Sequence, residues 1–210
     1  MKITDVEAIV LVWPPPENHF WTSLRPIGRV NELLVRVYTD GGHVGIGEAH
    51  GSGLFREGSN GDLIAAGASR VVVDGLKPLL VGEDPLDNER LWQKMFGLTH
   101  QRGYNLRGWD RTQIMTAIAS VDIALWDLKG KAANLPVYKV LGGSRDRVPC
   151  YVTGGYYQDG KTTADLAREC ETYVDMGYNA IKLKIGGVSV EEDVARVKAV
   201  RGALGPGIDL

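Results

Sequence analysis

The fold is decided by the last part of the chain, residues 147–210, which reads RVPCYVTGGYYQDGKTTADLARECETYVDMGYNAIKLKIGGVSVEEDVARVKAVRGALGPGIDL. Two apolar runs each end near a pair of glycines and precede a segment with helical spacing; the runs are 147–153 and 179–185, and the helical segments are 162–176 and 190–203. A further run begins at Ile208. Strands that alternate with helices through short turns predict a parallel sheet made of repeated strand–helix units.

The first part of the chain has a different pattern. Residues 3–12, 31–39 and 43–49 have the spacing of strands, and Asp40-Gly41-Gly42 is a turn signal between the last two. Two runs joined by a glycine-containing turn form a hairpin. The chain is therefore predicted to open with a three-stranded antiparallel meander.

Helical segments and two loops complete this first part. Helical spacing is found over 61–73, 86–99 and 112–133, and Thr112 is the expected N-cap of the last segment. Two segments without such spacing are predicted to be loops, namely 14–30 and 50–60. Because the pattern changes near residue 145, we predict one domain over 1–145 and a second over 146–210.

Composition and charge narrow the class of protein. Of the 210 residues, 44% are hydrophobic and 24% are charged, as in ordinary globular proteins. The formal net charge is −2, which gives no electrostatic footprint for nucleic acid. Apolar runs such as Val71-Val72-Val73 fall far short of the roughly 18 residues that a membrane helix needs. We therefore expect no nucleic-acid partner and no membrane partner.

The N-terminus and the cysteines point to a cytoplasmic protein. Acidic residues Asp5 and Glu7 lie inside the first apolar run, whereas a signal peptide has a basic start and an uninterrupted apolar core. Cys150 and Cys170 lie in apolar segments and are both predicted to be buried thiols, without a disulfide framework.

Gly45-Ile46-Gly47 resembles the start of a dinucleotide-binding loop, but His50 stands where the third glycine is required and the setting is a hairpin. We therefore reject a dinucleotide-binding loop at this position.

Lys182 and Lys184 are the strongest candidates for chemistry. They are two residues apart on one predicted strand, so both point to the same side of it, about 6.6 Å apart at the Cα atoms. In an antiparallel sheet this alternation would be an ordinary solvent-facing pattern. Parallel sheets are covered on both faces, however, and a βα barrel places its active site at the C-terminal ends of its strands. There, each ammonium disfavours protonation of the other, which would make a usable general base.

Several motifs together resemble a known family. They are ASVDIALWDLKGKA (119–132), LPVY (135–138), LGG (141–143), Gly45-x-Gly47-Glu48 and Lys182-x-Lys184. These stretches are similar to the mandelate racemase and muconate lactonizing enzyme branch of the enolase superfamily. The resemblance covers essentially all of the chain, and the segment over 119–132 is its most specific part.

The resemblance implies an α+β capping domain followed by the first two to three βα units of a modified TIM barrel, which is truncated here. It implies Mg²⁺-assisted removal of the proton α to a carboxylate. Lys184 would be the general base, and Lys182 would tune its pKa and contact the carboxylate. The family's three carboxylate metal ligands are expected after Leu210, so no metal ligand is expected in this chain. Family members often form homo-oligomers, which the resemblance extends to this protein.

Further residues are candidates for substrate contact. The family places two cap loops over the active site, and the corresponding candidates here are His19, Trp21, Arg25, His50 and Arg56. Thr153 and Tyr156 follow the first predicted barrel strand and are expected at the mouth of the site. For each of these residues, an ordinary loop or surface position remains the alternative.

The resulting functional hypothesis is dehydration of an acid sugar by the full-length parent protein, with a small carboxylate substrate. Racemisation or epimerisation, which needs a second base, and cycloisomerisation are the alternatives within enzymes. The alternative outside enzymes is an inactive fragment that lacks the metal site. A barrel needs about 250 residues, and residues 147–210 supply two complete units, so we expect the chain of 210 residues to be inactive by itself.

Overall fold

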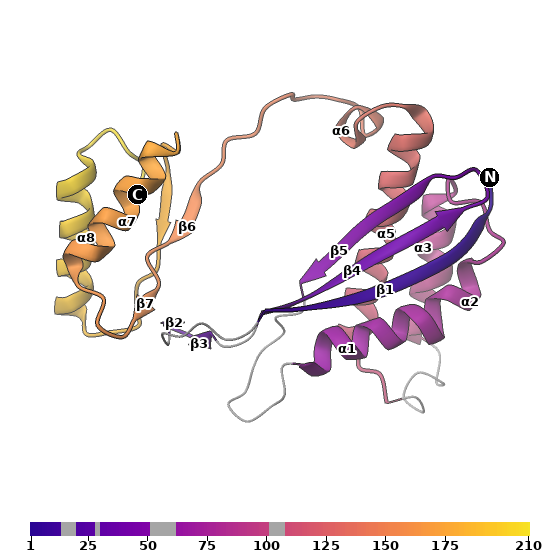
Figure 1. Cartoon of the computed structure of the whole chain (residues 1–210), viewed down its shortest axis with the longest axis horizontal. Helices are drawn as coiled ribbons and strands as arrows, with labels where there is room; N and C mark the ends of the chain where they lie inside the picture. The colour runs from indigo at the N-terminus through magenta and orange to yellow at the C-terminus, as the bar shows by residue number, and fades with distance from the viewer. Residues whose placement is uncertain (14–19, 28–29, 51–61, 101–107) are drawn as a thin grey trace. The chain divides into compact units, whose positions relative to one another are not determined.

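The computed structural model describes residues 1–13, 20–27, 30–50, 62–100 and 108–210. The chain divides into two compact units (Figure 1). The first consists of Met1–Trp13 with Val30–Asp146, and the second of Pro14–Arg29 with Arg147–Leu210. Residues 14–29 thus belong to the second unit, although they lie early in the sequence.

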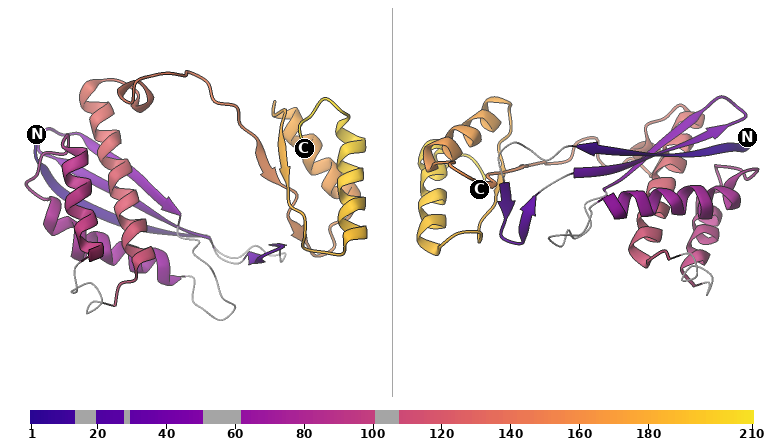
Figure 2. Two further views of the ribbon diagram at one scale, coloured as in Figure 1. Left: turned by 180° about the vertical axis from the view of Figure 1, so that it is seen from behind. Right: turned by 60° about the horizontal axis from the view of Figure 1, so that its bottom comes forward.

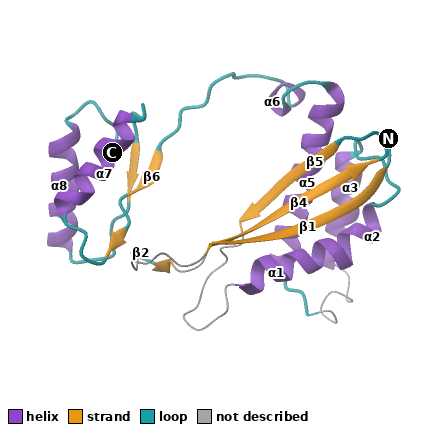
Figure 3. Cartoon of the chain, viewed as in Figure 1, coloured by secondary structure: helices purple, strands orange, loops and turns teal. Residues whose placement is uncertain are grey.

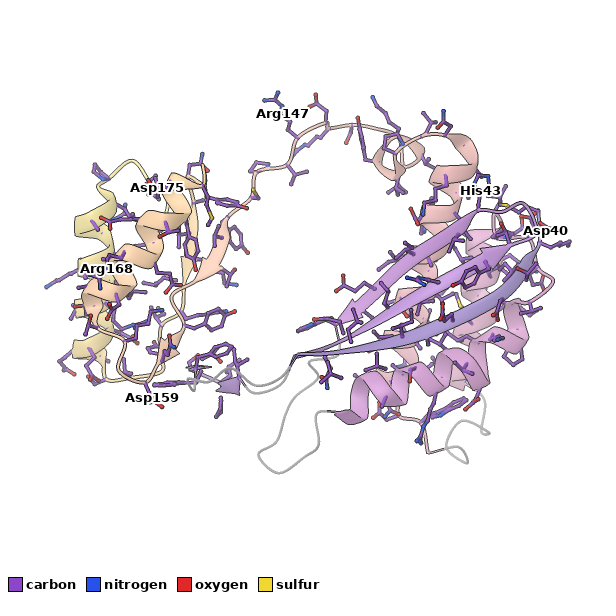
Figure 4. The ribbon with its side chains drawn as sticks, viewed as in Figure 1. Asp40, His43, Arg147, Asp159, Arg168 and Asp175 are labelled. Carbon is purple, nitrogen blue, oxygen red and sulfur yellow. The ribbon has the colours of Figure 1, made fainter. Side chains whose placement is uncertain are left out.

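The first unit contains an antiparallel meander of β1 (Ile3–Trp13), β4 (Val30–Thr39) and β5 (Val44–His50), in the order β1-β4-β5 (Figure 3). This confirms the predicted three strands. Alternate residues of β4, such as Leu33, Val35 and Val37, are fully buried, while those between them are half-buried. One face of the sheet therefore packs on the helices. The turn between β4 and β5 carries Asp40 and His43 (Figure 4).

Several helices cover that face of the sheet. A continuous helical stretch is formed by α1 (Asp62–Arg70), the π-helical turn η1 (Val71–Leu76) and α2 (Lys77–Leu80), so it extends beyond the end expected at residue 73. The other helices are α3 (Asn88–Phe96), the 3₁₀ turn η2 (Gly97–His100), α5 (Arg111–Ala133) and α6 (Val137–Val140). The buried apolar residues of α1, η1, α2, α3 and α5 form one cluster with those of β1 and β4.

The start of α5 differs from the prediction. Its N-cap is Asp110, not Thr112. The Asp110 carboxylate accepts from the Gln113 N–H at 2.8 Å, and Gln113 Oε1 accepts from the Asp110 N–H at 3.0 Å. This reciprocal capping box satisfies two backbone N–H donors. Thr112 is not the N-cap, because it already lies inside the first turn of α5.

The close packing of α5 on β5 explains the Gly45-x-Gly47 motif. A Cβ atom on Gly47 would lie 1.9 Å from the carbonyl oxygen of Ser120, and one on Gly45 would lie 2.2 Å from that of Ala124. Two further views show the long helix α5 lying against the sheet (Figure 2). The glycines therefore serve helix–strand contact, in keeping with the rejection of a dinucleotide loop.

The second unit contains the predicted strand–helix repeat. It runs β6 (Val152–Gly154), α7 (Thr163–Asp175), β8 (Ile181–Leu183) and α8 (Val190–Leu204). β6 and β8 pair in parallel, and a parallel bridge joins Ala180 to Asp209, where a further strand was expected. β6 is shorter than the prediction of 147–153 and ends one residue later; Pro149, in the expected strand, has no N–H to pair.

The prediction of a loop over 14–30 was wrong for its described part. β2 (Phe20–Thr22) and β3 (Arg25–Ile27) form a short antiparallel hairpin, and β2 also pairs with β7 (Tyr157–Gln158). Strands of two or three residues give little alternation to recognise. Their pairing depends on β7, which is more than a hundred positions away in the sequence. The second predicted loop falls largely on 51–61, outside the described residues.

The cysteines and the helices complete the comparison with the sequence. Cys170 is buried as predicted, but Cys150 is exposed, because it precedes β6 instead of lying within a strand. In the described ranges, no helix combines the length and the apolar character needed to span a membrane.

Candidate active site

The two lysines lie at the C-terminal end of β8. Lys182 pairs in register with Thr153 of β6, and the Lys184 N–H donates to the Gly154 carbonyl oxygen at 3.3 Å. Ile181 and Leu183, which alternate with the lysines, join the apolar cluster of the second unit. The strand therefore directs its apolar side chains to the helices and its lysines to the opposite side.

An aromatic ring lies beside each ammonium group. Lys182 Nζ is 6.0 Å from the ring centroid of Tyr151, and Lys184 Nζ is 5.4 Å from that of Tyr156. Such cation–π contacts contribute about 0.5–1 kcal/mol at exposed sites. Tyr156 in turn meets Phe20 of β2 edge to face, with ring centroids 5.6 Å apart. The aromatic side chains thus border the two lysines with flat, partly apolar surfaces.

A pair of glycines follows each strand, at 154–155 at the end of β6 and at 186–187 shortly after β8, and the turn after β6 is held by a carboxylate. Glu169 of α7 accepts from the Gly155 N–H at 2.9 Å and from the Tyr173 hydroxyl at 2.7 Å, and it pairs with Lys161. Burial acts to raise the pKa of Glu169, but the hydrogen bonds from Lys161, Gly155 and Tyr173 outweigh it and leave the pKa below its ordinary value. The turn beside Thr153 is therefore held by an ionised group.

Three of the predicted substrate residues lie in the second unit with the lysines and have side chains that the structure describes. Thr153 is exposed at the end of β6, and Tyr156 is half-buried beside Lys184. Trp21 of β2 stacks on Tyr157 at 5.8 Å between ring centroids, and its indole N–H lies 3.5 Å from the Gly187 carbonyl oxygen. Trp21 therefore contacts the turn that follows Lys184, a contact that no local sequence signal indicates.

The other predicted substrate residues are not brought to the lysines by the described structure. His50 ends β5 in the first unit, where its Nδ1 lies 2.5 Å from Glu32 Oε1 on β4. His19 and Arg56 lie outside the described residues, and so does the side chain of Arg25, whose backbone belongs to β3. Their role in binding substrate stays a prediction.

The described residues do not by themselves fit a metal ion. No three histidine, cysteine, aspartate or glutamate side chains gather in a possible metal site within the described ranges. Asp127 of α5, for example, accepts from the Ile46 N–H at 2.8 Å and from Lys131 Nζ at 2.7 Å. That carboxylate closes the edge of β5 and is engaged in structural hydrogen bonds.

Comparison with known families assigns the chain to the family that its sequence motifs resemble. The family model described as "Mandelate racemase / muconate lactonizing enzyme, N-terminal domain" matches residues 6–142, and "Enolase C-terminal domain-like" matches residues 165–210. The chain belongs to the mandelate racemase/muconate lactonizing enzyme family. This confirms the resemblance inferred from the sequence and, with it, a truncated enolase-superfamily fold.

Individual members of the mandelate racemase/muconate lactonizing enzyme family catalyse different reactions. The arabinonate dehydratase of Saccharolobus solfataricus is 40% identical over 178 residues, covering 85% of this chain and 43% of that protein. The D-galactarolactone cycloisomerase of Agrobacterium fabrum is 32% identical over 212 residues, covering 100% of this chain and 50% of that protein. A solved dipeptide epimerase from Enterococcus faecalis, complexed with Mg and a dipeptide, has a TM-score of 0.74 at 27% identity, covering 99% of this chain and 52% of that one.

These matches also show how much of a relative the chain represents. It spans 43–50% of the length of the arabinonate dehydratase and the cycloisomerase. The relatives are enzymes, namely dehydratases, cycloisomerases and epimerases.

Proposed function

We propose that the whole protein removes the proton α to the carboxylate of a sugar acid and then eliminates the β-hydroxyl, as a Mg²⁺-dependent dehydratase. The observation that carries the proposal is the Lys182-x-Lys184 pair at the C-terminal end of β8, in a chain of this family. Barrel enzymes build their active sites at this end of the strands. The identity of 40% to an arabinonate dehydratase favours dehydration over the other reactions.

In the proposed reaction, Lys184 Nζ takes the α-proton and the C–H electron pair moves toward the carboxylate. The electron pair then returns to form a double bond between the α- and β-carbons as the bond between the β-carbon and its hydroxyl breaks, and the hydroxyl leaves as water with the proton that Lys184 Nζ had taken. The remaining enol rearranges to a 2-keto acid. Lys182 supplies a second positive charge for the substrate carboxylate, and Mg²⁺, bound through residues that follow Leu210, would stabilise developing negative charge.

Thr153, Tyr156 and Trp21 have supporting roles in the proposal. Thr153 offers a hydroxyl beside Lys182, and Tyr156 offers a flat face beside Lys184. Trp21 supports the turn after Lys184 from the hairpin side. Sugar hydroxyls need partners of this polar and aromatic kind for orientation.

The test uses the full-length protein with Mg²⁺ and a panel of sugar acids in D₂O. We expect release of a 2-keto acid, and a loss of about 10²–10⁴-fold in rate for Lys184→Ala. The control is Lys198→Ala, on the exposed surface of α8, which should leave the rate unchanged. A Lys184→Ala variant with full activity would overturn the proposal.

Cycloisomerisation is the second candidate, because a D-galactarolactone cycloisomerase is among the relatives that cover the whole chain. Conversion of a lactone without loss of water would identify it. Deuterium uptake at the α-carbon without a keto product would instead identify epimerisation. The purified chain of 210 residues is expected to be inactive in each assay.

A further inference from the structure

The turn that follows Lys184 is held by a ring of hydrogen bonds that the proposed chemistry does not use. The Gly186 N–H donates to Asp193 Oδ2 at 2.6 Å, and the Gly187 N–H donates to the Tyr157 hydroxyl oxygen at 2.9 Å. The Tyr157 hydroxyl itself donates to Asp193 Oδ1 at 2.7 Å. Both carboxylate oxygens of Asp193 therefore act on one turn, one directly and one through Tyr157.

The packing leaves this turn little freedom. Gly186 has φ +87°, in the left-handed region that favours glycine. A Cβ atom on Gly187 would lie 2.5 Å from the Tyr157 ring, so the ring rests directly against the backbone. Trp21 stacks on the same ring and places its indole N–H at the Gly187 carbonyl oxygen. The turn is thus fixed by hydrogen bonds and by packing together.

Arg196 connects this turn to the one after β6. It is 7% exposed, and its Nη2 donates to the Gly155 carbonyl oxygen at 2.7 Å. Its Nε lies 3.5 Å from Asp193 Oδ1, and its guanidinium carbon lies 4.2 Å from the Tyr157 ring centroid. Because a buried charge is costly unless it is paired, Arg196 and Asp193 stabilise each other in this position.

The turn after β6 is held in the same way. There the Gly155 N–H donates to the Glu169 carboxylate, and the Tyr173 hydroxyl donates to the same oxygen. In each strand–helix unit, a glycine N–H and a tyrosine hydroxyl meet on a carboxylate of the following helix. Backbone N–H groups in glycine turns can bind an anion. Here the N–H groups of Gly155, Gly186 and Gly187 instead donate to side chains of the protein itself.

We propose that Asp193 is a positioning residue for Lys184, acting through Gly186 and Tyr157, with Arg196 keeping its carboxylate in place. Lys184 lies just past the end of β8 and is held on one side by its hydrogen bond to Gly154. The ring formed by Asp193 holds the chain two residues later, so the direction of the lysine is set from both sides. A base displaced by about 1 Å can lose about 10²-fold in rate. This inference rests on the proposed role of Lys184.

The test compares three variants of the full-length protein in the steady-state assay. Asp193→Asn removes the charge and one acceptor, and we expect kcat to fall about tenfold to a hundredfold with KM changed less than threefold. Tyr157→Phe keeps the ring and removes the hydroxyl, and it should lower kcat by a smaller factor. Glu191→Gln is the control, because Glu191 is an exposed acid in the same first turn of α8, and it should leave both constants unchanged.

Hydrogen–deuterium exchange distinguishes positioning from general stability. In Asp193→Asn, amide exchange should rise in the segment 184–188, while the helices α7 and α8 keep their protection. Should kcat in both Asp193→Asn and Tyr157→Phe match the control, the inference is wrong. The same holds if exchange rises throughout the second unit. Full activity of Lys184→Ala would instead overturn the proposed function, and the inference with it.

Discussion

The two units of the chain differ in how completely they bury their apolar residues. Among the described residues, the first unit has a cluster of twenty buried apolar side chains, and the second has a cluster of four, Leu166, Cys170, Ile181 and Val200. On α8, Val190, Val194 and Val197 are 74%, 45% and 36% exposed at helical spacing. An antiparallel meander with its helices closes a core locally, whereas strand–helix units need further units to cover their faces.

The sheet of the first unit also has the better-covered edge. The edge of β5 in the first unit is closed by α5, because Asp127 accepts from the Ile46 N–H and Lys131 donates to the Val44 carbonyl oxygen at 2.7 Å. In the described part of the second unit, β6 pairs with β8, and Ala180, which precedes β8, forms a single parallel bridge with Asp209. Stability is therefore expected to come mainly from the first unit, whereas the lysines that we propose as catalytic belong to the second unit.

The largest expected effect is the difference between the units in isolation. A fragment of residues 1–146 should unfold in urea as one cooperative transition, because it contains the large apolar cluster. A fragment of residues 147–210 should show no cooperative transition, because an apolar cluster of four buried side chains cannot offset the chain entropy. Circular dichroism during a urea titration measures both. Cooperative unfolding of the second fragment would contradict the comparison.

A single methyl group should disrupt the first unit. Gly47→Ala is expected to destabilise the chain by about 3 kcal/mol, because its Cβ would overlap the Ser120 carbonyl and α5 would have to move. Gly97→Ala is the matched control, since its Cβ would meet nothing within 4 Å, and it should change stability by less than about 0.5 kcal/mol. Equal urea midpoints for the two variants would show that the helix–strand contact is looser than described.

In the second unit, the contribution of Glu169 to the stability of the fold should depend on pH. Its pKa lies below the ordinary 4.5, so the ionised form stabilises the fold, and this contribution is present above pH 4.5 and is lost as the pH falls through the folded value. At pH 7, Glu169→Gln should therefore cost about 1–2 kcal/mol in the full-length protein. The loss of stability in Glu169→Gln should become smaller below pH 4.5. Glu171→Gln, an exposed change on the same helix, is the control, and a deficit independent of pH would argue against the ionised clamp.

The smallest expected effect is a difference between the rates at which the two cysteine thiols are alkylated, and it involves no change in the stability of the native chain. Burial raises the pKa of the Cys170 thiol to about 11, and its side chain is fully covered, whereas Cys150 is exposed. At pH 8, iodoacetamide should therefore modify Cys150 of the native chain at least about tenfold faster than Cys170. Peptide mapping by mass spectrometry reads both rates. Similar rates would show that the small core of the second unit opens readily.

Local sequence patterns predicted the meander, the long helix α5 and the strand–helix repeat, because each depends on periodicity and on turn residues close in the chain. They also predicted that both lysines lie on one side of β8. They did not predict the hairpin at 20–27, whose strands are two or three residues long and pair with Tyr157–Gln158. They also missed Asp193 and Arg196, whose contacts lie up to 41 positions away.

What the sequence determined by itself is the family, the order of the elements and the candidate base. Strand alternation alone predicts that Lys182 and Lys184 lie on the same side of the strand. The tertiary structure alone decided which groups surround them. It placed Trp21 and Tyr157 against the Gly186-Gly187 turn and joined Asp193 to Arg196, because hydrogen bonds and ring packing between distant segments depend on the three-dimensional path of the chain. The same holds for Gly45 and Gly47, whose role became clear only from the approach of α5.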